Sequence, residues 1–165
     1  MSTANHFCFF LPIFAAMKLV IQRVKEASVS ISGHLHSAIG QGLLVLAGIA
    51  QDDTVKDLEY AAHKLVQMRI FSDEHGLMNL SVKDVAGDIL VVSQFTLMAQ
   101  TRKGNRPSYI EAARPEVAIP LYEQFCKLVA ELSGKPPATG VFGADMKVNL
   151  LNDGPVTIVL DSREK

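Results

Sequence analysis

Cysteine is scarce in this sequence of 165 residues, which holds two cysteines and no tryptophan. Cys8 and Cys126 have neither the spacing of metal ligands nor that of a disulfide framework, a pattern typical of a protein in the reducing cytoplasm. The histidines are scattered, and the nearest pair, His34 and His36, lacks the carboxylate or cysteine that would complete a metal site. The sequence therefore predicts no metal and no cofactor.

Net charge is also small, because 16 lysines and arginines stand against 17 aspartates and glutamates, which leaves −1 at pH 7. Proteins that bind a long stretch of nucleic acid are usually strongly basic, since their lysines and arginines neutralise phosphates. This balance argues against extended duplex binding. Any contact with nucleic acid must be local, to an end or to a few phosphates.

Long apolar runs are missing too. The N-terminal stretch from Phe7 to Met17 is apolar, but it contains Pro12 and is far shorter than the ~20 residues of a membrane span. A signal peptide is not indicated either, because no lysine or arginine precedes Lys18. We expect no membrane association, a leader or extension at residues 1–16, and a single domain at residues 17–165. A chain of this length can bury roughly 70% of its extended-chain surface.

The remaining sequence alternates or runs apolar in short segments that are typical of strands. The helical patterns are fewer. Thr54 and Asp57 form a capping box before a helix to about Phe71, Pro107 opens a short helix to about Ala113, and a longer helix, which Pro120 starts or kinks, ends at Gly134. Strands are predicted at residues 18–24, 27–32, 35–39, 42–49, 88–97, 145–151 and 156–161. The pattern predicts an α/β fold: a mixed, curved β-sheet or partial barrel with helices packed outside.

Polar side chains interrupt the end of the most apolar strand, at Ser93, Gln94 and Thr96 around Phe95. A strand that exits into solvent would explain them, and so would an active site, because buried polar groups need partners. A serine or threonine nucleophile requires a base, yet no histidine lies near in sequence. Backbone N–H groups of this segment would instead form an oxyanion hole, which needs no base.

A basic loop follows this strand and carries Arg102, Lys103 and Arg106. It is the densest basic patch in a nearly neutral chain. A solvated surface loop would account for it. So would a phosphate contact that positions the end of a nucleic acid.

Near the C-terminus, the segment from Asn152 to Pro155 joins two strand-like runs. It reads as a plain hairpin turn. The Gly154-Pro155 pair also allows a cis peptide bond, since X-Pro bonds adopt this form in tight turns. In that form two neighbouring carbonyls would point the same way and make a rigid pair of acceptors.

Two motifs together, "SQFTL" at residues 93–97 and "NDGPVT" at residues 152–157, resemble those of the D-aminoacyl-tRNA deacylase family. The resemblance covers about Met17 to Leu160. Five shorter matches occur in the family's order, "IQRV" at 21–24, "RIFSD" at 69–73, "MNLSV" at 78–82, "RPS" at 106–108 and "FGADM" at 142–146.

The resemblance implies a homodimeric hydrolase that cleaves the ester between a D-amino acid, or mischarged glycine, and the 3′-terminal ribose of tRNA. Gly154 and Pro155 of one subunit would enter the partner's site as a cis pair, bind the substrate's amino group and exclude L side chains. Arg23 would hold that pair, Phe142 and Met146 would line the pocket, and residues 93–96 would be catalytic. Arg102, Lys103 and Arg106 are the expected tRNA contacts.

Two other functions stay open at this stage. One is a nucleic-acid-binding module without catalysis, which the low charge disfavours for duplexes. The other is an amidohydrolase with Thr96 as nucleophile. Within the deacylase interpretation, Thr96 and the 2′-hydroxyl of the tRNA are both candidates for the catalytic group, and the lack of a flanking base favours the hydroxyl.

Overall fold

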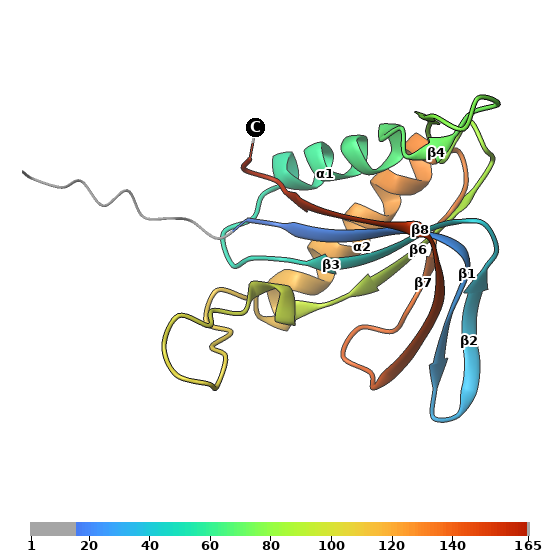
Figure 1. The fold of residues 1–165 in the computed structure, drawn as a ribbon. Helices are drawn as coiled ribbons and strands as arrows, with labels where there is room; N and C mark the ends of the chain where they lie inside the picture. The colour runs from blue at the N-terminus through green and yellow to red at the C-terminus, as the bar shows by residue number, and fades with distance from the viewer. Residues whose placement is uncertain (1–15, 165) are drawn as a thin grey trace, which may run out of the picture.

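The computed structural model describes residues 16–164, so the expected leader lies outside the described residues except for Ala16. The described part combines a curved sheet with two α-helices (Figure 1). The strands are β1 (Lys18–Ile31), β2 (His34–Ile39), β3 (Gly42–Gly48), β4 (Phe71–Ser72), β5 (Met78–Leu80), β6 (Asp88–Ser93), β7 (Ala138–Thr139) and β8 (Met146–Asp161). The helices are α1 (Val55–Gln67), the 3-10 helix η1 (Phe95–Met98) and α2 (Pro115–Ser133).

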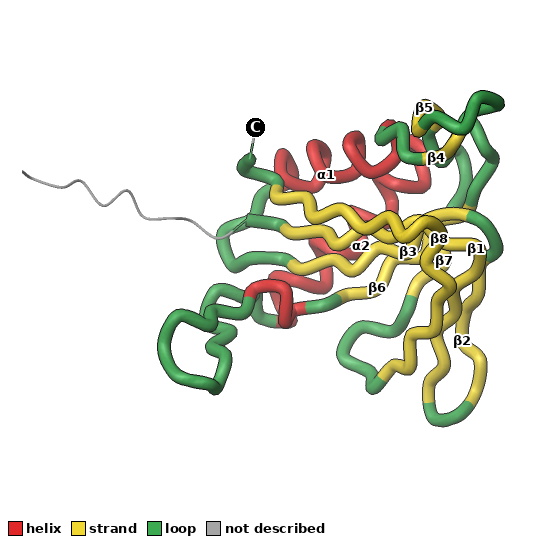
Figure 2. The backbone as a smooth tube through the Cα atoms, viewed as in Figure 1, coloured by secondary structure: helices red, strands yellow, loops and turns green. Residues whose placement is uncertain are grey.

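The main sheet is mixed, as predicted. β8 runs antiparallel to β1 along its whole length, from the pair Lys18–Asp161 to the pair Ile31–Met146. β2 and β3 therefore share the other edge of β1, where both are antiparallel to it. β3, β6 and β7 follow in parallel. Figure 2 shows the strands curving, so that β2 and the adjoining parts of β1 and β8 turn away from the helices.

Both faces of β3 and β6 are covered, which explains their continuously apolar sequences. Leu43 and Val45 face a core that includes Leu58 of α1 and Phe125 of α2. Leu44 faces a second core inside the curve of the sheet. That second core also contains Val24, Ala27, Val29, Ile39, Leu90 and Val92. The helices thus pack outside the sheet, as expected from the sequence.

Several predicted boundaries were wrong for reasons of non-local pairing. The two strands expected at 18–24 and 27–32 form the single strand β1, whose register shifts near Val24. The helix expected from Pro107 to Ala113 does not form, because Ala113 donates its N–H to the Ile49 carbonyl at 2.9 Å. Helix α2 begins at Pro115 instead, and Pro120 lies inside it.

The helix ends agree better with expectation. Thr54 and Asp57 form the predicted capping box at the start of α1, which ends at Gln67 rather than near Phe71. Gly134 closes α2 in the left-handed conformation, at φ 85°, which glycine adopts without steric cost. No helix within residues 16–164 is long and apolar enough to span a membrane.

Candidate active site

A pocket of about 280 Å³ opens where β3 and β6 end. Ser93, Gln94 and Phe95 line one side of it, and Phe142 and Met146 line another. The structure therefore brings together five of the residues proposed from sequence, from two segments about fifty positions apart. The remaining lining residues are mostly small or apolar: Ala47, Ile49, Val92, Ala113, Ala118, Gly143, Ala144, Asp145 and Val148.

The polar segment does not continue the strand as predicted. β6 ends at Ser93, the Gln94 N–H donates to the Ala47 carbonyl at 2.8 Å, and η1 begins at Phe95. Gly48 makes this turn possible, because a Cβ atom there would lie 2.9 Å from Leu97 Cβ and 3.0 Å from the Gln94 carbonyl oxygen. Sequence reasoning missed Gly48; the glycine that closes an otherwise apolar strand is the signal that could have found it.

Thr96 lies beside the pocket rather than among the residues that line it. Its hydroxyl oxygen accepts a hydrogen bond from the Gln94 side-chain amide. An amide cannot remove a proton, so this contact does not activate a nucleophile. As the first residues of η1, Phe95 and Thr96 have N–H groups without an acceptor inside that helix.

The part of the wall that contains Phe142 is fixed by a contact with α2, which is bonded in turn to β6. The Phe142 ring packs edge-on against Tyr122, with ring centres 6.2 Å apart, and the Tyr122 hydroxyl donates to the Val91 carbonyl at 2.9 Å. Burial raises the pKa of Tyr122, which therefore stays neutral. Gly140 allows Met146 to pack closely, since a Cβ at Gly140 would overlap the Met146 sulfur.

The segment from Asn152 to Pro155 is not the hairpin turn that its sequence suggests. Asn152 pairs with Val24 and Thr157 pairs with Gln22, so both flanking runs belong to the one strand β8. The residues between them form a bulge opposite Arg23. The peptide bond between Gly154 and Pro155 in this bulge is cis. Long-range pairing with β1 thus overrides the local turn signal.

Arg23 forms hydrogen bonds that hold the bulge. Its side chain is largely buried, and its Nε donates to the Asp153 carbonyl at 2.9 Å while its Nη1 donates to the Ile70 carbonyl at 2.6 Å. A guanidinium suits this position because its rigid fork donates in two directions at once.

Gly154 and Pro155 themselves are exposed and lie outside the pocket of their own chain. They extend from the middle of β8, whereas the pocket is built from the ends of β3 and β6 and from residues 142–148. Within one chain, these two parts of the proposed site are therefore separate.

Asn152 is a residue that the sequence reasoning did not single out. Its Oδ1 accepts from the Val156 N–H at 2.8 Å, and its Nδ2 donates to the Thr157 hydroxyl at 2.9 Å. The side chain thus closes the bulge from one end while Arg23 holds it from the other. Asparagine before a glycine-containing segment is a common device for such closure, and this was the available signal.

We expect Asn152→Asp to weaken activity about 5- to 20-fold, because aspartate keeps the acceptor for Val156 but loses the donor to Thr157. The measurement is kcat/KM for the D-aminoacyl-tRNA ester that the family resemblance implies as substrate. Asn149→Asp, on an exposed position of the same strand, is the control and should stay within about twofold of the parent. Equal losses in both variants would show that closure of the bulge is not responsible.

The basic loop projects from the body of the molecule (Figure 1). Arg102, Lys103 and Arg106 are exposed and do not line the pocket. Arg102 lines a separate polar cavity of about 270 Å³ together with Lys18 and Glu111. All three cationic side chains are thus accessible to a phosphate group. Their contact with tRNA stays a prediction.

Neither the Cys126 thiol nor a metal cluster adds a second reactive centre within residues 16–164. Burial raises the pKa of the Cys126 thiol to about 11, so it is neutral at physiological pH. Among residues 16–164, no three histidine, cysteine or acidic side chains are placed to hold a metal ion.

The fold and the pocket define an α/β protein with a candidate active site at the ends of two parallel strands. Comparison with known proteins identifies the family. A model of the D-Tyr-tRNA(Tyr) deacylase family matches residues 20–161. The chain belongs to this family.

Individual relatives agree with this assignment. A D-aminoacyl-tRNA deacylase of Porphyromonas gingivalis is 62% identical over 149 residues, which cover 90% of this chain and 99% of the relative. One of Parabacteroides distasonis is 58% identical over the same shares of both chains. A solved structure of a c-Myc DNA unwinding element binding protein is 43% identical, with a TM-score of 0.82 over 87% of this chain and 97% of that one.

A more distant structure supports the fold alone. A probable eukaryotic D-amino acid tRNA deacylase superposes with a TM-score of 0.77 at 19% identity, over 88% of this chain and 99% of that chain.

Proposed function

We propose that this protein is a D-aminoacyl-tRNA deacylase. It hydrolyses the ester between a D-amino acid, or glycine, and the 3′-terminal ribose of tRNA. Water attacks the ester carbonyl, the bond to the ribose oxygen breaks, and the free amino acid and the tRNA hydroxyl result. The proposal rests on family membership and on the pocket that unites residues 93–95 with Phe142 and Met146.

The proposed working unit is a homodimer in which Gly154 and Pro155 complete the partner's pocket. The supporting observation is that both residues are exposed and lie apart from their own pocket, although Arg23 and Asn152 hold the bulge that carries them. Main-chain carbonyls presented there would bind the substrate's ammonium group. An L side chain would collide with this wall, while hydrogen or a D side chain would point away from it.

The wall excludes an L substrate because the L side chain would collide with it. Glycine has no side chain, so the wall cannot reject it. Removal of glycine from tRNA thus follows from the same geometry. The site of action is the cytoplasm, where aminoacyl-tRNA is present. Only the acceptor end must be held, which suits a chain of net charge −1 with one basic loop.

The activity is tested by incubating the protein with D-tyrosyl-tRNA and L-tyrosyl-tRNA and following the loss of each ester. We expect rapid loss of the D-ester and persistence of the L-ester. A stable D-ester would refute the proposal. It would favour the alternative of a non-catalytic nucleic-acid-binding module, which is also suggested by the name of the 43% identical structure.

The catalytic group is tested by Thr96→Ala. We expect kcat/KM for D-tyrosyl-tRNA to fall less than about tenfold, because the Thr96 hydroxyl contacts the Gln94 amide and no base. Replacing the terminal ribose by its 2′-deoxy form should cost far more, because the 2′-hydroxyl assists the reaction. Complete loss in Thr96→Ala, with a trapped acyl adduct in the parent, would support a threonine nucleophile instead.

A further inference from the structure

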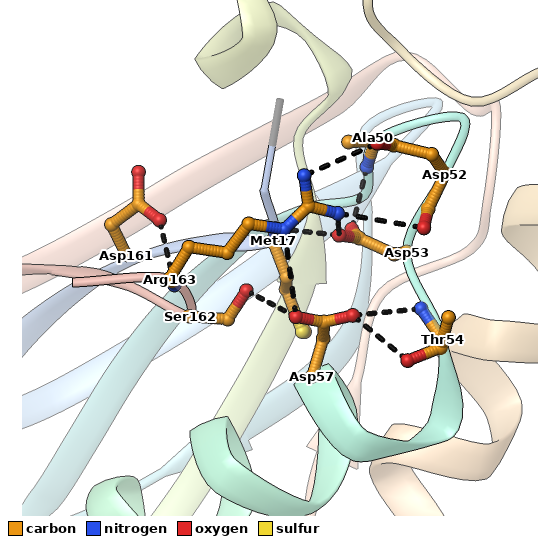
Figure 3. Close-up of polar contacts among 9 residues, drawn as sticks. All are labelled: Met17, Ala50, Asp52, Asp53, Thr54, Asp57, Asp161, Ser162 and Arg163. Atoms are coloured by element: carbon orange, nitrogen blue, oxygen red, sulfur yellow. Dashed lines mark hydrogen bonds and ion pairs between the residues drawn. The ribbon is translucent and has the colours of Figure 1, made fainter. Parts of the chain in front are cut away.

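The start of β1, the end of β8 and the loop before α1 meet in a charged cluster that the proposed reaction does not use (Figure 3). Arg163 supplies its guanidinium, which lies 3.1 Å from Asp52, 3.6 Å from Asp53 and 3.9 Å from Asp57, measured between nitrogen and carboxylate oxygen. One positive charge thus faces three carboxylates. The cluster is short of positive charge.

Asp53 is the buried member of the cluster, and its side chain is 0% exposed. Its Oδ2 accepts from the Ala50 N–H at 2.7 Å, and its Oδ1 accepts from the main-chain nitrogen of Met17 at 2.9 Å. Two neutral amides and a guanidinium at 3.6 Å compensate a buried carboxylate incompletely. Burial, assisted by Asp57, raises the pKa of Asp53 to about 6 despite the opposing amides and Arg163.

Met17 is held firmly in this place. Its side chain is fully buried, and its carbonyl accepts from the Ser162 N–H at 3.0 Å. In the 165-residue chain its nitrogen is a neutral amide. In a chain that begins at Met17 the same atom would be an α-ammonium group, with a free-chain pKa of about 7.7–8.0. The missing positive charge would then lie within hydrogen-bond distance of the buried carboxylate.

The matched length of the relatives is that of a chain that begins at Met17. The curated relatives match 149 residues of this chain and are covered to 99% of their own length. This number equals the length from Met17 to Lys165. A chain that begins at Met17 keeps every residue of the two hydrophobic core clusters and loses, among the described residues, one buried residue, Ala16.

We propose that the buried carboxylate of Asp53 is a binding site for the α-ammonium group of Met17. The ion pair would tie the first strand to the loop that follows β3. That loop supports the candidate active site, because Ile49 lines the pocket and accepts the Ala113 N–H. The proposal does not depend on the deacylase activity.

A double-mutant cycle on melting temperature tests this site. The 165-residue chain and a chain that begins at Met17 are each prepared with and without Asp53→Asn. At pH 7, we expect the shorter chain to melt about 3–8 °C higher when Asp53 is present. The gain should fall to less than half with Asp53→Asn, and should persist in the control Asp145→Asn, which alters an exposed carboxylate. An equal gain with and without Asp53, or no gain, would overturn the proposal.

The pH dependence provides a second readout that needs no variant. In the 165-residue chain, the raised pKa of Asp53 means that its contribution to stability declines as pH rises from about 4 to about 6. In the shorter chain the ammonium group favours the ionised form of Asp53, which lowers the pKa of this carboxylate and removes the decline in stability. Asp53 raises the pKa of the ammonium group in the folded state above its free-chain value. The stabilisation by the ammonium group is therefore complete below about pH 7.7 and is lost as pH rises through the folded-state pKa.

The difference in melting temperature between the two chains should therefore grow from pH 4 to 6, stay level to about pH 8 and fall at higher pH. Asp52, Asp57, Asp161 and Arg163 also face this place, but they are common to both chains and their effects largely cancel in the difference. A difference that does not vary with pH would contradict an ammonium site, even where Asp53→Asn fails to fold.

Discussion

Replacing Gly154 with alanine is expected to lower kcat/KM for D-tyrosyl-tRNA by at least about 100-fold, or roughly 2.7 kcal/mol of transition-state stabilisation. A Cβ atom at this position would lie 2.9 Å from Arg23 Nη2 and 2.9 Å from Val156 Cγ2. The backbone also has φ 134°, where side chains are strained. The bulge must shift, and with it the carbonyls that we propose bind the substrate's ammonium group.

The control for this variant is Gly33→Ala. Gly33 has φ 77° in the turn between β1 and β2, but a Cβ there would contact nothing within 4 Å. Gly33→Ala therefore also places alanine at a positive φ, but without the crowding. We expect Gly33→Ala to lower the melting temperature by a few degrees and to leave kcat/KM within about twofold. Comparable activity losses in the two variants would mean that crowding at Gly154 has no role in catalysis.

Replacing Arg23 with lysine is expected to lower kcat/KM by about 10- to 100-fold and the free energy of unfolding by about 2–4 kcal/mol. Lysine keeps the positive charge, but a single ammonium cannot reach both the Ile70 and the Asp153 carbonyls that the guanidinium joins. One buried carbonyl would lose its partner, and the bulge would lose its anchor. Steady-state kinetics and chemical denaturation measure the two effects separately.

Lys25→Met is the matched control for Arg23. Lys25 also approaches Asp153, at 3.3 Å from its carboxylate, but its side chain is 57% exposed and gives no main-chain hydrogen bond to the bulge. Exposed ion pairs contribute little, so we expect less than a twofold change in activity. A large loss in Lys25→Met would show that charge near Asp153, rather than the geometry of Arg23, is what matters.

The local patterns in the sequence predicted the features that local physics decides. The apolar runs of β3 and β6 indicated strands, and the runs are continuous because both faces of these strands meet a core. Thr54 and Gly134 marked helix ends through capping and left-handed backbone. The polar residues at the end of the apolar strand indicated a site; Ser93 and Gln94 line the pocket, whereas Thr96 does not.

The features that sequence reasoning missed depend on residues far apart in the chain. The turn after Ser93 is set by Ala47 and by the space that Gly48 leaves. The bulge at 152–155 replaces the predicted hairpin because β1 pairs with both sides of it. The helix predicted at 107–113 does not form, because backbone groups of this stretch form hydrogen bonds with the segment that follows β3. Local preference could not reveal any of these contacts.

The most direct measurement is a mixing experiment with two inactive variants. Gly154→Ala impairs the bulge, and Ala144→Trp fills the pocket that Ala144 lines; each alone should be nearly inactive. In a mixed dimer, the intact pocket of one chain meets the intact bulge of the other. If subunits exchange freely, half of the dimers are mixed and one of their two sites works, so activity should recover to about a quarter of the parent value. If the bulge serves its own chain's pocket, or the protein is a monomer, the mixture will remain as inactive as its components.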